Sequence, residues 1–132
     1  MNIDVINRGR KMCLADTMSF LEFVKTLIDV GMERYTVDFV SLKAAYYSIN
    51  NEVYITDFEF EKLPISLQFD QASVKEAVLA SREGRMKYKD FLPYIANAGC
   101  CRYEVFITGK KVIYFGRDGS THIELFPENR QS

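Results

Sequence analysis

The sequence is poor in the residues from which metal sites and disulfide frameworks are built. Its 132 residues include one histidine, His122, and three cysteines, Cys13, Cys100 and Cys101. A single histidine excludes a multi-histidine metal site, and we expect neither a metal nor a cofactor. An odd number of cysteines, two of them adjacent, argues against a disulfide framework and favours reduced thiols in the cytoplasm.

Long apolar runs and an excess of charge of one sign are also missing. No run approaches the ~20 apolar residues that span a bilayer, so no membrane contact is expected. Charged residues interrupt the first stretch of the chain, which argues against a cleaved signal peptide and again favours the cytoplasm. Lys and Arg number 17 and Asp and Glu number 18, a net charge of −1. Dedicated nucleic-acid-binding domains are usually basic, so a nucleic-acid partner is not expected.

The most informative feature is an internal repeat. Residues 20–55 align without a gap to residues 88–123 at a constant offset of 68. Eight of the 36 aligned positions are identical, and glycine and aromatic residues keep their register. Chance does not readily produce such a match, so we interpret the segments as copies of one supersecondary unit. The identical pairs are Phe23/Phe91, Gly31/Gly99, Arg34/Arg102, Tyr35/Tyr103, Val37/Val105, Lys43/Lys111, Tyr46/Tyr114 and Ile55/Ile123.

Each copy predicts one helix followed by three strands. In the first copy, Ser19 and Glu22 form a capping box, which is typical of a helix start. Apolar residues follow at helical spacing, and Gly31 is suited to the left-handed conformation that ends a helix. Residues that alternate between apolar and polar then predict strands. The second copy repeats this pattern, with a helix from about Tyr88 to Ala98 that ends at Gly99.

A further helix is expected before each copy. The first covers residues 3–14, and the second covers residues 73–82, where Ser73 and Glu76 form another capping box. Residues 57–70 are too apolar for a flexible linker, and we expect them to pack as a strand-like crossover.

The order of elements predicts an α+β fold. We expect a duplicated ααβββ unit whose antiparallel strands pack against the helices. One such unit has only a small apolar face and open sheet edges. Two copies should therefore cover each other's edges and merge their cores into one. Residues 1–132 are therefore expected to form a single pseudo-two-fold domain. Its repeats would cover about 1–56 and 71–127 and would be joined by the packed crossover 57–70.

Two segments of the chain resemble a known family. They are residues 31–38 and 88–127, and the second contains the stretches Lys111–Arg117 and His122–Pro127. Together they are similar to the YbcV-like family of small bacterial and prophage-encoded proteins, a domain of unknown function sometimes labelled "phage envelope protein". The resemblance implies a bacterial or prophage origin. It supplies no established activity and no catalytic residue.

A cysteine–histidine pair is the candidate for catalysis. Cys100 or Cys101 could act as a nucleophile with His122, and Glu124 shares a strand face with the histidine. The alternative is a structural histidine that is hydrogen-bonded to a neighbour. Both cysteines follow a helix-ending glycine, and the negative end of a helix dipole raises a thiol pKa, which favours a packing role for them.

Four paired residues are the candidates for ligand binding. Arg34 and Arg102 occupy equivalent positions and could flank a cleft and bind an anion, or could serve as structural clamps. Tyr46 and Tyr114 are also equivalent, and we expect them to pack on the sheet with their hydroxyl groups reaching solvent.

The pattern as a whole favours a non-enzymatic binding or regulatory module. Two packed copies without a recognisable catalytic set point to a site in the groove between the repeats or at a sheet edge. A homodimer or another protein partner is compatible with exposed aromatic residues and sheet edges. The alternatives are a small enzyme with a Cys/His site and a prophage structural or accessory component. The sequence does not identify the ligand or the partner.

Overall fold

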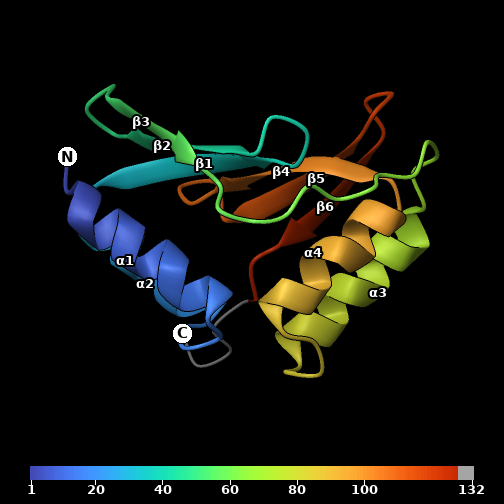
Figure 1. Ribbon diagram of the computed structural model, residues 1–132. Coiled ribbons are helices and arrows are strands. Elements are labelled where there is room, and N and C mark those ends of the chain that lie inside the picture. The colour runs from blue at the N-terminus through green and yellow to red at the C-terminus, as the bar shows by residue number, and fades with distance from the viewer. Residues whose placement is uncertain (128–132) are drawn as a thin grey trace.

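The computed structural model describes residues 1–127. Their helices and strands follow the order ααβββ, which occurs two times along the chain (Figure 1). The elements of the first half are α1 (Ile3–Leu14), α2 (Phe20–Asp29), β1 (Met32–Asp38), β2 (Lys43–Ser48) and β3 (Val53–Asp57). Those of the second half are α3 (Gln71–Arg82), α4 (Tyr88–Asn97), β4 (Cys100–Phe106), β5 (Lys111–Gly116) and β6 (Thr121–Leu125). The predicted α+β class is confirmed.

Each element of the second half lies 68 residues after its counterpart in the first half. For example, α1 begins at Ile3 and α3 at Gln71, and β3 ends at Asp57 and β6 at Leu125. The same offset extends to the first helix of each half, which lies outside the aligned segments of the sequence. The order and bounds of the elements are therefore consistent with a duplicated ααβββ unit.

The six strands form one antiparallel sheet in the order β3-β2-β1-β4-β5-β6. The two halves meet where β1 pairs with β4, and we call this pairing the seam. In the seam Thr36 lies opposite Glu104, and these positions are equivalent at the offset of 68. The pairs on either side, Arg34–Phe106 and Asp38–Arg102, exchange under the same offset. A pseudo-two-fold axis therefore passes through the Thr36–Glu104 pair.

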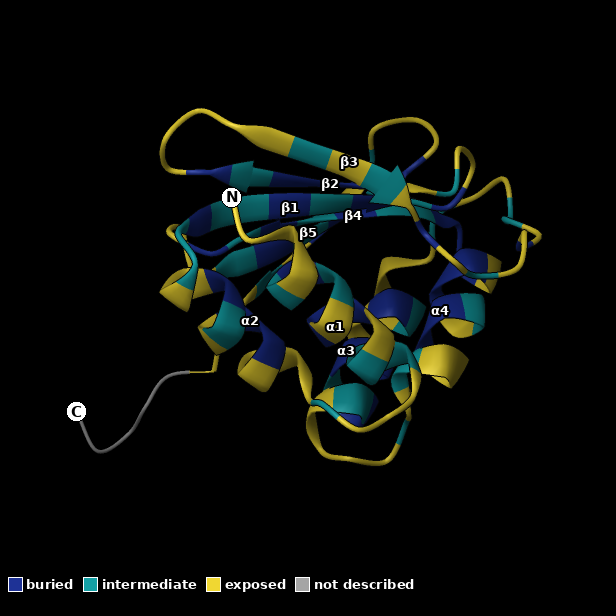
Figure 2. Cartoon of the chain, turned by 60° about the vertical axis from the view of Figure 1, so that its left-hand side comes forward, coloured by how far each residue is buried: buried dark blue, intermediate teal, exposed yellow. Residues whose placement is uncertain are grey.

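All four helices of residues 1–127 cover one face of this sheet, as two hairpins. Hairpin α1–α2 lies below the first three strands, and hairpin α3–α4 lies below the last three (Figure 1). Buried residues gather where the helices meet the sheet, and the far sides of the helices are exposed (Figure 2). The core is continuous across the seam, since buried side chains of both halves belong to one cluster.

The equivalent helices α2 and α4 bury equivalent side chains. Phe23 and Leu27 of α2 are at most 4% exposed, and Phe91 and Ile95 of α4 are at most 5% exposed. Burying a side chain of this size contributes about 1.5–3 kcal/mol. Helix α2 begins as predicted, because Ser19 Oγ accepts from the Glu22 amide and Glu22 Oε1 accepts from the Ser19 amide.

Helix α3 starts two residues earlier than the sequence predicts. Its N-cap is Asp70, whose Oδ1 accepts a hydrogen bond from the Ser73 backbone amide. Ser73 is therefore in the first turn, and the predicted capping box with Glu76 is wrong. Aspartate and serine are both favourable N-cap residues. Their N-cap preferences alone therefore do not decide between Asp70 and Ser73.

The crossover between the halves is packed, but it is not a strand. After β3 ends at Asp57, residues 58–70 run beside the helices without regular structure, and Phe58 and Leu63 are buried. The amides of Ser66 and Asp70 donate to the carbonyl groups of Ala96 and Ala98 at the end of α4. The backbone of the crossover is thus partly satisfied by a helix end rather than by a neighbouring strand.

Candidate functional site

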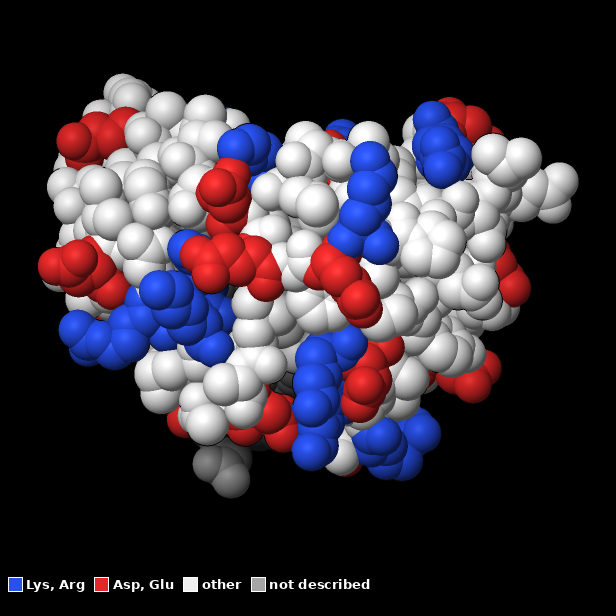
Figure 3. Space-filling model, in the orientation of Figure 1, with Lys and Arg blue, Asp and Glu red and all other residues white. Residues whose placement is uncertain are grey.

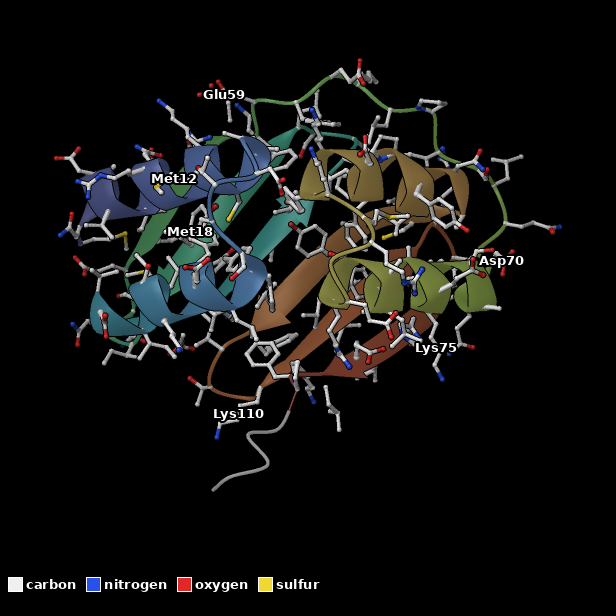
Figure 4. All side chains as sticks on the ribbon, turned by 90° about the horizontal axis from the view of Figure 1, so that it is seen from below. Met12, Met18, Glu59, Asp70, Lys75 and Lys110 are labelled. Carbon is white, nitrogen blue, oxygen red and sulfur yellow. The ribbon has the colours of Figure 1, made fainter. Side chains whose placement is uncertain are left out.

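A cavity of about 430 Å3 lies between the two helical hairpins, under the inner face of the sheet. Small-molecule sites in proteins are usually clefts of about 300–1,000 Å3. Seen from below, the hairpins stand apart, and Met18 lies at the turn between α1 and α2 (Figure 4). The surface is hollowed between the hairpins, and charged residues of both signs are interspersed over this view (Figure 3).

Tyrosines from four strands form the floor of the cavity. Tyr35 and Tyr46 come from the first half, and their ring centroids are 5.2 Å apart. The equivalent Tyr103 and Tyr114 come from the second half, with centroids 5.8 Å apart. Strand alternation places all four on the inner face, where the rings pack against the helices.

Equivalent helical residues build the walls on opposite sides. Phe23 of α2 makes an edge contact with Tyr35, at a centroid distance of 5.7 Å. Its counterpart Phe91 of α4 makes an edge contact with Tyr114, at 6.1 Å. Met18 and Met86, also 68 residues apart, line the cavity from the two helix–helix turns. Both halves therefore contribute matched side chains to a cavity on the pseudo-two-fold axis.

Burial raises the pKa of every tyrosine on this floor well above its usual value. Tyr103 forms a hydrogen bond with the hydroxyl group of Tyr88. Within residues 1–127, the hydroxyl groups of Tyr35, Tyr46 and Tyr114 have no hydrogen-bond partner. They are not fully enclosed by protein atoms, so a molecule in the cavity could contact them. Three phenolic groups are thus available at the cavity.

Tyr46 and Tyr114 pack on the sheet as expected, but their hydroxyl groups reach the cavity rather than the outer surface of the sheet. These residues are only 1% and 7% exposed. Both point toward the helices rather than to the open face of the sheet, because they share the buried face of their strands. They are nevertheless residues of the cavity, as is Glu124.

One end of the cavity carries a buried cation, Arg10 of α1. This residue is 6% exposed, and its Nε donates to Asn7 Oδ1 at 2.9 Å. Its Nη2 donates to Glu59 Oε1 at 3.3 Å, from the segment that runs beside α1 (Figure 4). Its Nη1 is buried without a partner among the described residues. A buried polar group in this state costs free energy, so the guanidinium group would gain from turning Nη1 toward an acceptor in the cavity.

The other end of the cavity carries a cation that is paired with a carboxylate, Arg82 of α3. Arg82 Nη2 donates to Glu124 Oε2 at 3.0 Å and to the Leu125 carbonyl group at 3.1 Å. Glu124 Oε1 also lies 2.9 Å from His122 Nε2. Gln71 Nε2 lies 3.4 Å from His122 Nδ1. Donation from the Gln71 amide to Nδ1 would leave the proton on Nε2, which then donates to the glutamate.

The cysteine–histidine pair is not assembled in the described structure. Both ring nitrogens of His122 are engaged by Glu124 and Gln71, and Cys100 Sγ donates to the Arg102 carbonyl group at 3.3 Å. Burial raises the pKa of the Cys100 thiol to about 12. Burial and, to a smaller extent, Asp38 also raise the pKa of Cys101. Thiols that stay protonated at neutral pH are poor nucleophiles.

Arg34 and Arg102 lie together, but on the outer face of the sheet. Their Nη1 atoms are 2.9 Å and 3.8 Å from the two carboxylate oxygens of Glu104, which lies between them. Each guanidinium group also stacks over an aromatic ring at 3.7 Å, Arg34 over Tyr47 and Arg102 over Phe115. The two arginines are therefore paired with a carboxylate and do not line the cavity.

Neither arginine of the cavity was identified as a site residue from the sequence. A signal for Arg10 was present, because it follows the apolar Ile6 by four residues and so shares its helix face. Ile6 and Arg10 are both buried. Arg82 had no comparable signal, since its partner Glu124 is 42 residues away along the chain.

Two further properties bear on function. In the part of the chain that the structure describes, no helix has the length and apolar character needed to cross a membrane. No group of three or more potential metal-ligating His, Cys, Asp and Glu residues occurs within residues 1–127.

Comparison with known proteins identifies a family without assigning an activity. No curated protein is a significant match to the chain. The model of a family described as "Protein of unknown function (DUF1398)" matches residues 20–129. The match covers both helical hairpins except for α1, and all of the strands. The chain therefore belongs to this family of proteins of unknown function.

Proposed function

We propose that this protein is a non-enzymatic binding module that holds a small, largely apolar molecule in the cavity between its helical hairpins. The observation that supports this most directly is the aromatic cavity of about 430 Å3. Its walls bring together apolar surface and a few convergent polar groups, including the hydroxyl groups of Tyr35, Tyr46 and Tyr114. This combination is typical of ligand sites.

The binding energy would come mainly from burial of apolar surface. Moving such surface out of water contributes about 25 cal/mol per Å2, and aromatic walls supply close contacts in addition. The tyrosine hydroxyl groups can orient a ligand, since each can donate or accept one hydrogen bond. The thiols of Cys100 and Cys101, whose pKa values are both raised, give no comparable support to the alternative of a Cys/His enzyme.

The opening between the hairpins provides a route for entry. It is bordered by the α1–α2 turn, where Asp16 has a φ of 61°, and by the α3–α4 turn, where Gly84 has a φ of 75°. Lys87 Nζ lies 3.9 Å from Asp16 Oδ2 and links the two turns. Both side chains are at least half exposed, and such ion pairs are weak, so this contact would open at little cost.

A neutral dye tests the proposal. We expect Nile red to bind the protein with a rise in fluorescence, and Cys13→Phe, which places a large ring in the cavity, to weaken binding at least about tenfold. The matched control is Cys101→Phe, because Cys101 lies outside the cavity. Melting curves of both variants establish that they are folded. Absence of dye binding, or equal binding by the two variants, would contradict the proposal.

The resemblance to YbcV-like proteins supports a second proposal about origin: a bacterial, prophage-encoded accessory protein of the cytoplasm. It rests on residues 31–38 and 88–127 and is independent of the cavity. Detection of the protein in purified virions would instead favour a structural component.

A further inference from the structure

We infer that the ligand of the cavity is an apolar monocarboxylate whose acidic group binds Arg10. This inference rests on the proposed function and adds the chemical class of the ligand and its orientation. It is carried by the position, burial and incomplete pairing of one guanidinium group.

Arg10 is a buried cation with an unused donor. Its side chain is 7% exposed, and Nη1 is enclosed without a partner among residues 1–127. Its carboxylate neighbour, Glu59, contacts only Nη2, at 3.3 Å, and the Glu59 side chain is 61% exposed. A carboxylate so open to water offsets a buried charge only in part. A turn of the guanidinium group that brings Nη1 to the cavity would therefore let it bind a further anionic partner.

The cavity is symmetric in shape but not in charge. The position equivalent to Arg10 in the second half is Val78, which also lines the cavity. The other cavity arginine, Arg82, is 68 residues after Leu14, and its charge is offset by Glu124, which accepts a hydrogen bond from Nη2. An elongated ligand would therefore bind in one direction, with its acidic group at the α1 end.

The charge balance favours a monoanion. One guanidinium group, partly offset by Glu59, supplies less than one net positive charge at the site. Carboxylates match the planar fork of arginine and can form strong charge-assisted hydrogen bonds with it. The aromatic floor and walls between Arg10 and Arg82 would contact the apolar body. A medium-length fatty acid and an aryl-substituted carboxylic acid both meet these requirements.

Displacement of Nile red by two probes of equal chain length tests the inference. The probes are dodecanoate and dodecanol, used below the concentration at which they aggregate. We expect wild-type protein to bind dodecanoate about ten- to a hundredfold more tightly than dodecanol, as for a hydrogen bond to a charged group. Arg10→Met should abolish this preference while binding of dodecanol is retained. Arg82→Met is the matched control and should keep the preference.

A second variant avoids the buried site. Glu59→Gln removes an exposed counter-charge, so we expect it to tighten dodecanoate binding about two- to fivefold and to leave dodecanol binding unchanged. Equal binding of the two probes by wild-type protein, together with no effect of Glu59→Gln, would overturn the inference but not the proposed function. Loss of the preference in both arginine variants would also overturn it. Failure of Nile red and of both probes to bind would overturn the proposed function itself.

Discussion

Gly31 and Gly99 hold equivalent positions after the second helix of each half, yet their surroundings differ. Both have left-handed φ angles, 80° and 93°, which glycine adopts without a steric penalty. A Cβ atom at Gly31 would have no neighbour closer than Ile49 Cγ1, at 3.9 Å. At Gly99 it would lie 2.2 Å from the Gln68 carbonyl oxygen. Both positions favour glycine because of their φ angles. Only at Gly99 does the crossover also leave no room for a Cβ atom.

Alanine substitutions separate these two effects. We expect Gly31→Ala to lower the free energy of unfolding by about 1–2 kcal/mol, the cost of a left-handed alanine. Gly99→Ala should cost about 4 kcal/mol or more, because the crossover backbone must also move. Urea denaturation of the two variants measures the difference. Equal losses would show that residues 68 and 69 move away from position 99 freely.

Single residues also mark the limit of prediction from sequence. The sequence placed His122 and Glu124 on one strand face correctly, but it did not identify Gln71 or Arg82 as their partners. Those contacts join α3 to β6 and depend on tertiary packing. Likewise, Arg34 and Arg102 were recognised as equivalent residues, whereas their location on the outer face depends on the alternation around Tyr35 and Tyr103.

At the scale of the element, β6 presents His122 and Glu124 to the helices and Ile123 and Leu125 to the open face. His122 is 5% exposed, whereas Ile123 and Leu125 are 52% and 66% exposed. This inversion is possible because α3 supplies Gln71 and Arg82 as polar partners on the inner side. The outer face is free of helices within residues 1–127, so its side chains meet solvent.

Substitutions on the two faces of β6 should therefore differ in cost. We expect His122→Ala to lower the free energy of unfolding by about 1–3 kcal/mol, because Glu124 and Gln71 each lose a partner. Ile123→Thr should change it by no more than about 0.5 kcal/mol, since the residue is half exposed and threonine suits a strand. Chemical denaturation compares them. A larger loss for Ile123→Thr would mean that another surface covers this face.

Elements were more predictable than the contacts between them. The bounds of α1 and the capping of α2 followed from helical spacing and the capping box. The start of α3 and the conformation of residues 58–70 did not, because an alternative cap and bonds to the end of α4 decide them. The cavity was anticipated only as a groove between the repeats, since its volume depends on how the two hairpins are spaced.

At the scale of the whole molecule, the shared core makes stability sensitive to alkaline pH. Burial raises the pKa of Cys13 and Cys100 from 9.0 to about 12. It also raises the pKa of buried tyrosines from their usual 10.0. These are Tyr35, Tyr46, Tyr88, Tyr103 and Tyr114. The folded state favours the protonated forms, so this stabilisation is complete below about pH 9 and is lost as the pH rises.

We therefore expect the melting temperature to fall steeply above about pH 10. Tyrosinate absorbance from the buried rings should appear together with the loss of the circular dichroism signal. Tyr54 serves as an internal reference, because hydrogen bonds with Thr56 and Asn7 lower its pKa and it is free to ionise in the folded protein. Ionisation of the buried rings near pH 10 with the fold intact would contradict this prediction.

The seam makes each half dependent on the other. In a fragment of residues 1–66, β1 would expose the backbone groups that pair with β4, and the cavity side of Tyr35 would lose its cover. We expect this fragment not to fold as a monomer. Size-exclusion chromatography and thermal melting followed by circular dichroism test it. A monomeric fragment that melts cooperatively would show that one unit is sufficient.

The register of the seam has a consequence for assembly. The β1–β4 ladder relates equivalent residues across the pseudo-two-fold axis, and nothing in its hydrogen bonds distinguishes a partner strand in the same chain from one in another chain. An exchange of halves between two molecules that open at the crossover would therefore keep these hydrogen bonds and give an intertwined dimer. In that dimer each cavity would lie between the first helical hairpin of one polypeptide and the second helical hairpin of the other.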